Sequence, residues 1–83
     1  MATFILNDRV EVRGTRAQAW RAGEVTDASA HSGASYQVTL DTPVNGNAWD
    51  AGPRKLKGAN FISVVYIAKA SEVVLPGEHI RAE

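Results

Sequence analysis

Strict alternation of apolar and polar residues in two short segments is the feature that most restricts the fold. In residues 9–13, RVEVR, both valines point one way and the charged side chains point the other. Residues 36–40, YQVTL, repeat the pattern, with Tyr36, Val38 and Leu40 on the inward face. A period of two residues is that of a β-strand with one face in water. Both segments are therefore predicted to be strands that cover one side of a core.

A further strand is expected over residues 19–26, between these two segments. It carries Trp20 and Val25, with Gly23 between them. Glycine inside a strand marks a bulge, a sharp bend or a close approach of two backbones, and small barrels need such bends to close. The sheet is thus expected to curve at this strand.

The most apolar segment, residues 61–67, FISVVYI, does not alternate. Both faces of the strand that it predicts are largely apolar, as in strands covered on two sides. Either its odd-numbered or its even-numbered residues would fill the barrel. The other set would be covered by the loop before it or by a second copy of the chain, since a small domain rarely leaves such a stripe exposed. We therefore expect a homodimer or higher oligomer through this strand.

The remaining segments complete an all-β outline. A long loop is expected over residues 42–60, and loops of this length are often functional or mobile. Its Asn45-Gly46 pair favours a hairpin turn. Residues 68–71 fit one helical turn, residues 72–75 a closing strand, and residues 77–83 a flexible tail. Five short strands with one late helical turn predict a small barrel.

Length and composition narrow the class of protein. The 83 residues fit one domain, residues 1–83, whose stability margin is thin. Cysteine is absent, which excludes disulfides and thiolate metal sites, and His31 and His79 have no neighbour at metal-ligand spacing. Nine basic and nine acidic side chains give a formal charge of zero, which disfavours general nucleic-acid binding. We expect neither a metal nor a cofactor.

The sequence also carries no sign of a membrane or an export signal. No apolar stretch approaches the roughly 20 residues that cross a bilayer. The first residues, MATFILNDR, lack the basic start of a signal peptide. A cytoplasmic protein is the expectation, and the short chain has the size of a product of a mobile element or gene cassette.

Four segments in this order resemble the SH3-like barrel superfamily, and most closely its Tudor/Agenet branch. They are DRVEV at 8–12, AWRAGEV at 19–25, YQVTLD at 36–41 and GPRKL at 52–56. The likeness spans roughly residues 7 to 75. It implies a five-stranded SH3-like barrel, a fold that hosts many unrelated functions.

In Tudor-like barrels, aromatic residues at strand ends can form a cage for a methylated lysine or arginine, held by cation–π attraction. The resemblance places Trp20, Tyr36 and Phe61 where part of such a cage would lie, with Asp41 or Glu24 as an acid beside the cation. The alternative is that the three aromatic side chains belong to the core, because a barrel this small needs large residues to fill it.

A weaker resemblance points to an enzyme, the plasmid-borne type II dihydrofolate reductases. These are also small SH3-like barrels, and their pore motif aligns with Ser63-Val64-Val65-Tyr66. Tyr66 matches the family. Val64, however, stands where the family has the glutamine that holds its ligands, and Val12 where it has a pore lysine. Without these polar groups a pore could not orient its ligands by hydrogen bonds, so the protein is expected not to be an enzyme.

No residue set predicts a catalytic site. His31 and Ser32 are adjacent but lack an orienting third group. The six carboxylates on predicted strands and turns are all expected to point outward, without the desolvation that acid catalysis requires; they are Asp8, Glu11, Glu24, Asp27, Asp41 and Glu72.

Trp49 and a basic run form the binding candidates of the long loop. Trp49 has no neighbouring apolar run that would make it a core residue by pattern, so it either anchors an interface or caps the barrel end. Arg54, Lys55 and Lys57 place three positive charges within four residues, suited to an acidic partner or a phosphate backbone, or else to a solvated loop.

These observations favour a non-enzymatic binding or adaptor module. It would contact a protein partner through the barrel rim and the loop 42–60, with Trp49 inserted into the partner and the basic run steering its approach. A nucleic-acid-binding module is the second hypothesis and an oligomeric reductase the third.

Overall fold

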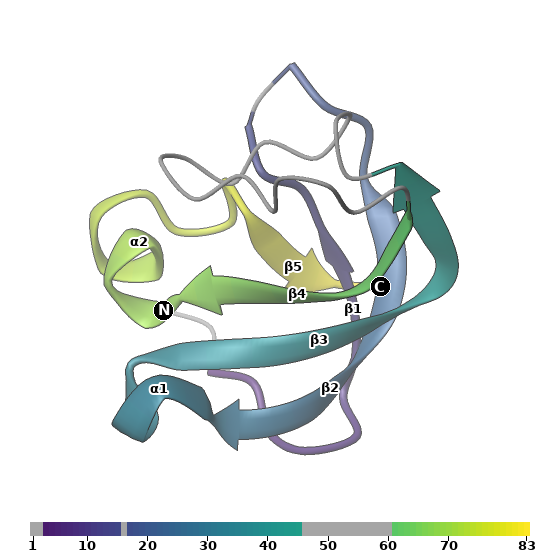
Figure 1. Ribbon diagram of the computed structural model, residues 1–83. Coiled ribbons are helices and arrows are strands. Elements are labelled where there is room, and N and C mark those ends of the chain that lie inside the picture. The colour runs from purple at the N-terminus through teal and green to yellow at the C-terminus, as the bar shows by residue number, and fades with distance from the viewer. Residues whose placement is uncertain (1–2, 16, 46–60) are drawn as a thin grey trace.

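Five antiparallel strands form a single sheet that coils around one apolar core. The computed structural model describes residues 3–15, 17–45 and 61–83. The strands are β1 (Arg9–Val12), β2 (Arg21–Ser29), β3 (Ser35–Asn45), β4 (Phe61–Ala68) and β5 (Ile80–Ala82). Their order across the sheet is β4-β3-β2-β1-β5, and the bent sheet brings β1 and β5 behind β3 and β4 in the view of Figure 1. The all-β prediction is confirmed.

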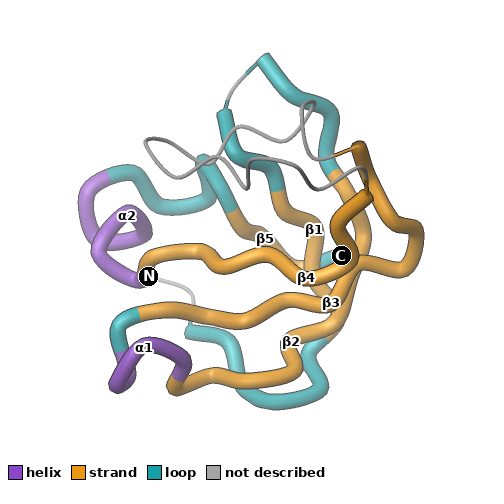
Figure 2. The backbone as a smooth tube through the Cα atoms, viewed as in Figure 1, coloured by secondary structure: helices purple, strands orange, loops and turns teal. Residues whose placement is uncertain are grey.

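Two short helices interrupt the strands (Figure 2). Helix α1 (Ala30–Gly33) joins β2 to β3, and helix α2 (Lys69–Val74) lies between β4 and β5. A helical element before the last strand was expected, whereas α1 was not. Neither helix is long and apolar enough to cross a membrane, in the part of the chain that is described.

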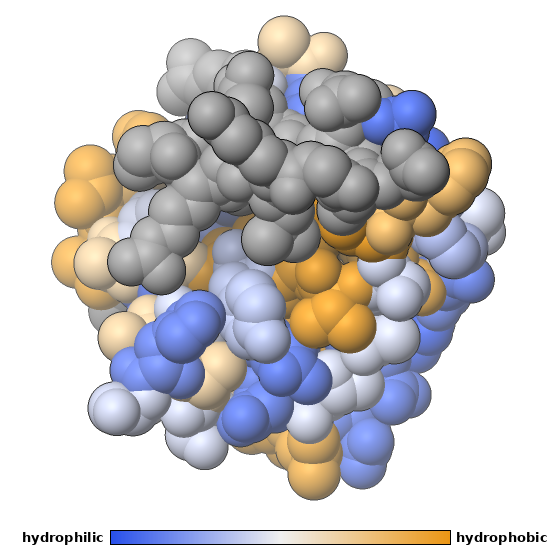
Figure 3. All heavy atoms as spheres, viewed as in Figure 1, coloured by the Kyte–Doolittle hydropathy of each residue, from blue (hydrophilic) through white to orange (hydrophobic). Residues whose placement is uncertain are grey.

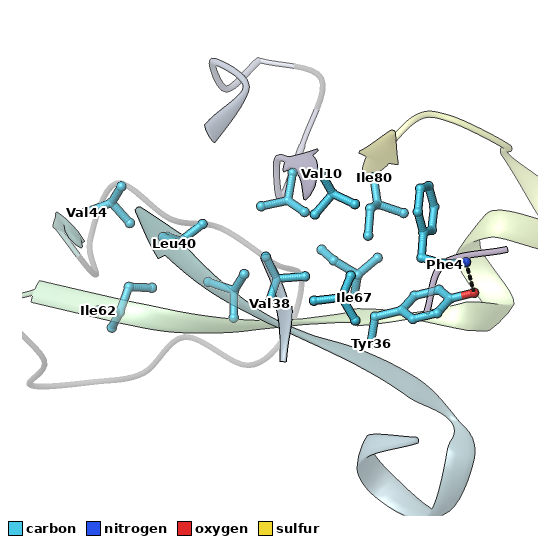
Figure 4. Close-up of a cluster of buried hydrophobic side chains, with 12 residues drawn as sticks. Phe4, Val10, Tyr36, Val38, Leu40, Val44, Ile62, Ile67 and Ile80 are labelled. Atoms are coloured by element: carbon cyan, nitrogen blue, oxygen red, sulfur yellow. Dashed lines mark hydrogen bonds between the residues drawn. The ribbon is translucent and has the colours of Figure 1, made fainter. Parts of the chain in front are cut away.

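The core lies on the inner face of the coiled sheet (Figure 4). The alternating segments behave as predicted, because Val10, Val12 and Val38 are fully buried and their polar neighbours are not. Every strand contributes, as does the N-terminal segment. The cluster consists of Phe4, Val10, Val12, Val25, Tyr36, Val38, Leu40, Val44, Ile62, Val65, Ile67 and Ile80.

At Gly23 the backbone of β2 lies close to β3. Its Cα pairs with Val10 of β1 and with Leu40 of β3. A Cβ atom at this position would lie 2.7 Å from the carbonyl oxygen of Thr39 and 2.8 Å from Val38 Cγ1. The predicted close approach at Gly23 is therefore confirmed.

Strand β3 extends further than the sequence predicts. Residues 42–45, assigned above to the loop, continue the strand, and Val44 is buried opposite Ile62. The pairing with β4 shifts between Thr39 and Val44, so that Leu40 to Pro43 bulge out of register. Proline ends regular pairing because it has no N–H to donate, but the strand resumes after it. The rest of the predicted loop, including the expected hairpin turn, lies outside the described residues.

The same irregularity explains why neither predicted set of residues fills the barrel from β4. The buried residues are Ile62, Val65 and Ile67, which mix even and odd positions. Val64 pairs with Thr39, but Ile62 already pairs with Val44. A bulge changes which face successive residues occupy, so simple alternation fails between residues 62 and 65.

The C-terminal region corrects two predictions. Residues 72–75 are not a closing strand: residues 69–74 form α2, with Val73 and Val74 exposed. Residues 77–83 are not simply a tail either, because β5 pairs with β1 through Val12 and Ile80. Ile80 is only 1% exposed. The β-branched residues at 73 and 74 favoured a strand there. The core is instead closed by Ile80, the single large apolar residue of the last segment.

The turn between β2 and β3 contains backbone strain. His31 and Ser32 have φ values of 53° and 59°, and Gly33 follows at 90°. The left-handed conformation costs an L-residue about 1–2 kcal/mol. Part of that cost would be removed by glycine, which enters this region readily.

Replacing Ser32 with glycine is therefore expected to stabilise the fold by about 0.5 kcal/mol, the relief of strain less the greater entropy of the unfolded chain. Ala34 has φ −84°, so Ala34→Gly is the matched control and should destabilise. Urea unfolding of the variants measures both effects. Loss of stability in Ser32→Gly equal to that in Ala34→Gly would contradict the assigned strain.

Candidate functional site

The aromatic candidates do not converge into a cage. Tyr36 pairs with Ile67, near one end of the β3–β4 ladder, and Phe61 pairs with Asn45 at the other. Six residues along β4 separate Ile67 from Phe61, or about 20 Å at 3.3 Å per residue. These two rings therefore cannot enclose one methylated cation, and the predicted cage is wrong.

Tyr36 is a core residue. Its ring meets Phe4 edge to face, with centroids 5.7 Å apart at 85°. The hydroxyl accepts a hydrogen bond from the Phe4 backbone N–H at 3.5 Å, and the Lys69 ammonium lies 5.0 Å from the ring centroid. The alternative prediction of a core role is confirmed for this residue.

Trp20 lies just before β2 and already binds cations of its own chain. The guanidinium carbons of Arg13 and Arg81 lie 4.3 and 4.0 Å from its ring centroid. Arg13 is held by the Glu78 carbonyl at 2.7 Å, and Arg81 by the Glu11 carboxylate at 3.0 Å. Cation–π contacts of this kind stabilise by about 0.5–2 kcal/mol. The π surface that a ligand would need is thus engaged within the fold.

Tyr66 belongs to the outward face of β4 and is 45% exposed. Its hydroxyl donates to Gln37 Oε1 at 3.3 Å, and its ring lies 4.6 Å from that of His31. Gln37 Nε2 in turn donates to Thr26 Oγ1 at 3.0 Å, and the hydroxyls of Thr26 and Thr39 are 3.0 Å apart. This hydrogen-bonded row crosses β4, β3 and β2 and fixes the orientation of the Tyr66 ring.

Beside that row the outward face of β4 is apolar. Phe61 is 70% exposed, and Val64 is half-buried between Phe61 and Tyr66. Figure 3 shows hydrophobic atoms gathered over the middle of β4, with hydrophilic atoms over β3. We call Phe61, Val64 and Tyr66 the outer face of β4. Exposed apolar side chains along one strand of a small domain are a candidate interaction surface.

Arg9, Arg13 and Arg81 each pair with carboxylates of the same chain. Arg9 bonds both to Asp41 and to Glu83, the latter at 2.9 Å. The hydrogen bond from Arg9 lowers the pKa of the Asp41 carboxyl, and the hydrogen bonds to Asp41 and Glu83 raise the pKa of Arg9. With Arg13 on Glu78 and Arg81 on Glu11, these arginines do not form an open basic stripe. Asp41 therefore pairs with Arg9 and is not an unpaired acid that could complement a cationic ligand.

Glu72 is a buried carboxylate that the sequence did not reveal. It was predicted to point outward from a strand, but it lies in α2 and is only 4% exposed. Its Oε2 accepts the Gly77 backbone N–H at 3.2 Å, whereas Oε1 has no partner among the described residues. The contact ties α2 to the turn that leads into β5. Its burial was not predicted, because residues 72–75 were expected to form a strand rather than part of a helix.

The positions compared with the reductase family separate in the structure. Val12 is fully buried in the core, so a side chain there does not reach an open surface, while Val64 and Tyr66 lie on the outer face of β4. His31 and Ser32 lie together in the strained turn. The described residues contain no group of three or more side chains suited to a metal ion. Trp49, Arg54, Lys55 and Lys57 lie outside the described residues.

Comparison with models of protein families, with curated proteins and with solved structures finds no match for this chain. The site must therefore be interpreted from its own chemistry. Its main elements are an apolar outer face on β4 and charged side chains that satisfy one another.

Proposed function

We propose that this protein is a non-enzymatic binding module that contacts protein partners, a second copy of itself among them. The contact surface comprises the outer face of β4 and the segment 46–60 that leads directly into it. Phe61 at 70% exposed carries the proposal. An aromatic side chain of this size contributes strongly to interfaces once it is desolvated.

The SH3-like barrel remains part of this proposal. Five antiparallel strands in one sheet and a short helix before β5 support this part of the proposal. Within such a module, Trp49 would insert into the partner, and Arg54, Lys55 and Lys57 would speed approach of an acidic surface. The formal charge of zero removes any net repulsion between two copies.

Sedimentation of the purified chain over the micromolar to high micromolar range tests the proposal. The chain should dimerise, and Phe61→Ser should weaken dimerisation by about tenfold or more, equal to about 1.4 kcal/mol. Trp49→Ala should weaken it as well. Leu6→Ser is the control. Leu6 is also an exposed apolar residue, but its neighbour Asn7 bonds to β2, which β3 separates from β4 in the sheet. A chain that stays monomeric at high micromolar concentration would overturn the self-association.

The alternative functions predict different experimental results. Nucleic-acid binding would weaken steeply with salt and would require Arg54, Lys55 and Lys57. A reductase would oxidise NADPH in the presence of dihydrofolate. Either result with the purified chain would replace the proposed function.

A further inference from the structure

We propose that the open edge of β4 pairs with the same edge of a second copy of the chain, antiparallel and centred on Tyr66. The inference rests on the self-association proposed above, and it adds to the outer face of β4 the strand edge beside it and a register for the pairing. The result would be one sheet running through both copies.

The edge itself is the first observation. β4 is the last strand of the sheet, and β3 is its only partner among the described residues. Sheet edges are normally protected by charged residues, proline or a short strand. β4 has eight residues, FISVVYIA, without a charge, a proline or a glycine. An edge of this kind favours pairing with another strand.

The hydrogen-bonding direction along β4 follows from a backbone contact of the residue directly after it. The Lys69 N–H donates to the carbonyl of Ala34, the residue before β3, at 2.9 Å. Because Ser35 pairs with Ala68, Ala34 is opposite Lys69, and the N–H at position 69 therefore points toward β3. Bonded and non-bonded pairs alternate in an antiparallel ladder. Ile67 and Val65 therefore also bond to β3, whereas Val64, Tyr66 and Ala68 direct their N–H and C=O groups to the open edge.

The two faces of β4 then select the register. From residue 64 to 68 the strand alternates regularly, with Val65 and Ile67 buried and Val64, Tyr66 and Ala68 outward. Opposed residues share a face of the sheet, so pairing must match inward with inward residues. A two-fold axis at Tyr66 is the symmetric register that pairs all five residues in this way. In this register the backbone N–H and C=O groups of Tyr66 bond to those of Tyr66 in the second copy.

A second copy fits this edge because the segment is self-complementary. No like charges would face each other, since the segment has none. At the two-fold axis Tyr66 would oppose Tyr66 of the second copy, and directly opposed side chains contribute roughly 0.2–1 kcal/mol. Antiparallel pairing about a two-fold axis closes after two chains and does not propagate.

Single cysteines test the register, since the chain has none of its own. Tyr66→Cys should form a disulfide-linked dimer under mild oxidation, because residues opposed across a two-fold axis come within the Cα separation of about 4.4–6.8 Å that a disulfide needs. Ser63→Cys is the control on the same strand, exposed like Tyr66. In the proposed register its two copies lie about 20 Å apart at 3.4 Å per residue, so it should remain unlinked.

Proline substitutions test the edge independently. Val64→Pro would remove only an outward N–H and should give a folded monomer by circular dichroism and sedimentation. Val65→Pro would remove a bond to β3 and should unfold the chain. A Val64→Pro variant that still dimerises would overturn the inference.

The results separate this inference from the proposed function. A dimer in which Ser63→Cys links as readily as Tyr66→Cys would overturn the register and leave self-association standing. A chain that stays monomeric would overturn both the register and the self-association. A monomer whose Val64, Tyr66 and Ala68 amides were still protected from hydrogen exchange would assign the edge to another segment of the chain.

Discussion

Replacing Gly23 with alanine is expected to destabilise the fold by about 3 kcal/mol or more, the upper range for overpacking a tight core. The added Cβ would meet the Thr39 carbonyl oxygen at 2.7 Å and Val38 Cγ1 at 2.8 Å. The backbone oxygen cannot turn away as a flexible side chain would. A domain of this length has a total stability of about 4–12 kcal/mol, so the variant should lose much or all of its fold. Urea unfolding followed by circular dichroism measures the loss.

Two controls isolate the steric cause at Gly23. Ala22→Ser changes the neighbouring residue of β2, which is half-buried, and should alter stability by about 0.5 kcal/mol or less. Gly33→Ala adds a methyl group where no atom lies within 4 Å, but at φ +90°, so it should cost about 1 kcal/mol through strain alone. A Gly23→Ala variant no less stable than Gly33→Ala would show that β2 and β3 can separate without cost.

Replacing Ile80 with alanine should cost about 2–5 kcal/mol, the range for truncating a buried isoleucine. Ile80 is 1% exposed and belongs to β5, where it pairs with Val12. Its loss would leave a cavity in the core and loosen the strand that closes the sheet. The free energy of unfolding in urea provides the measurement.

The same substitution elsewhere supplies the control. Ile5 is 64% exposed, so Ile5→Ala removes the same atoms from a surface position and should change stability by about 0.5 kcal/mol or less. Equal losses in the two variants would mean that residues 80–82 do not contribute to the core and that the predicted tail was right.

The fold could be predicted from the sequence where local periodicity and burial agree. The segments around Val10 and Val38 alternate and bury the valines as predicted. The prediction failed where pairing partners far along the chain decide the outcome. The bulge at Leu40 to Pro43 sets which residues of β4 are buried, and β5 exists because β1 offers it an edge. Both depend on contacts between segments that are far apart in the chain, so the pattern of a short segment does not reveal them.

The candidate site was predictable only in part. A second apolar face on β4 follows from the lack of alternation in residues 61–67, but which residues form that face does not. The position of Trp20 does not, because the arginines that cover its ring come from residues 13 and 81, far apart in sequence. Glu72 was missed for a related reason: a six-residue helix of β-branched and polar residues resembles a strand by propensity.

The pairing of β1 with β5 sets an order of events for biosynthesis. Residues 9–12 are made early, yet one of their two partner strands consists of residues 80–82. Contacts this distant in sequence slow folding, because a long loop must close before they form. Until residue 80 has been translated, the nascent chain therefore lacks the strand that carries Ile80, and the core residues that Ile80 joins stay uncovered on that side.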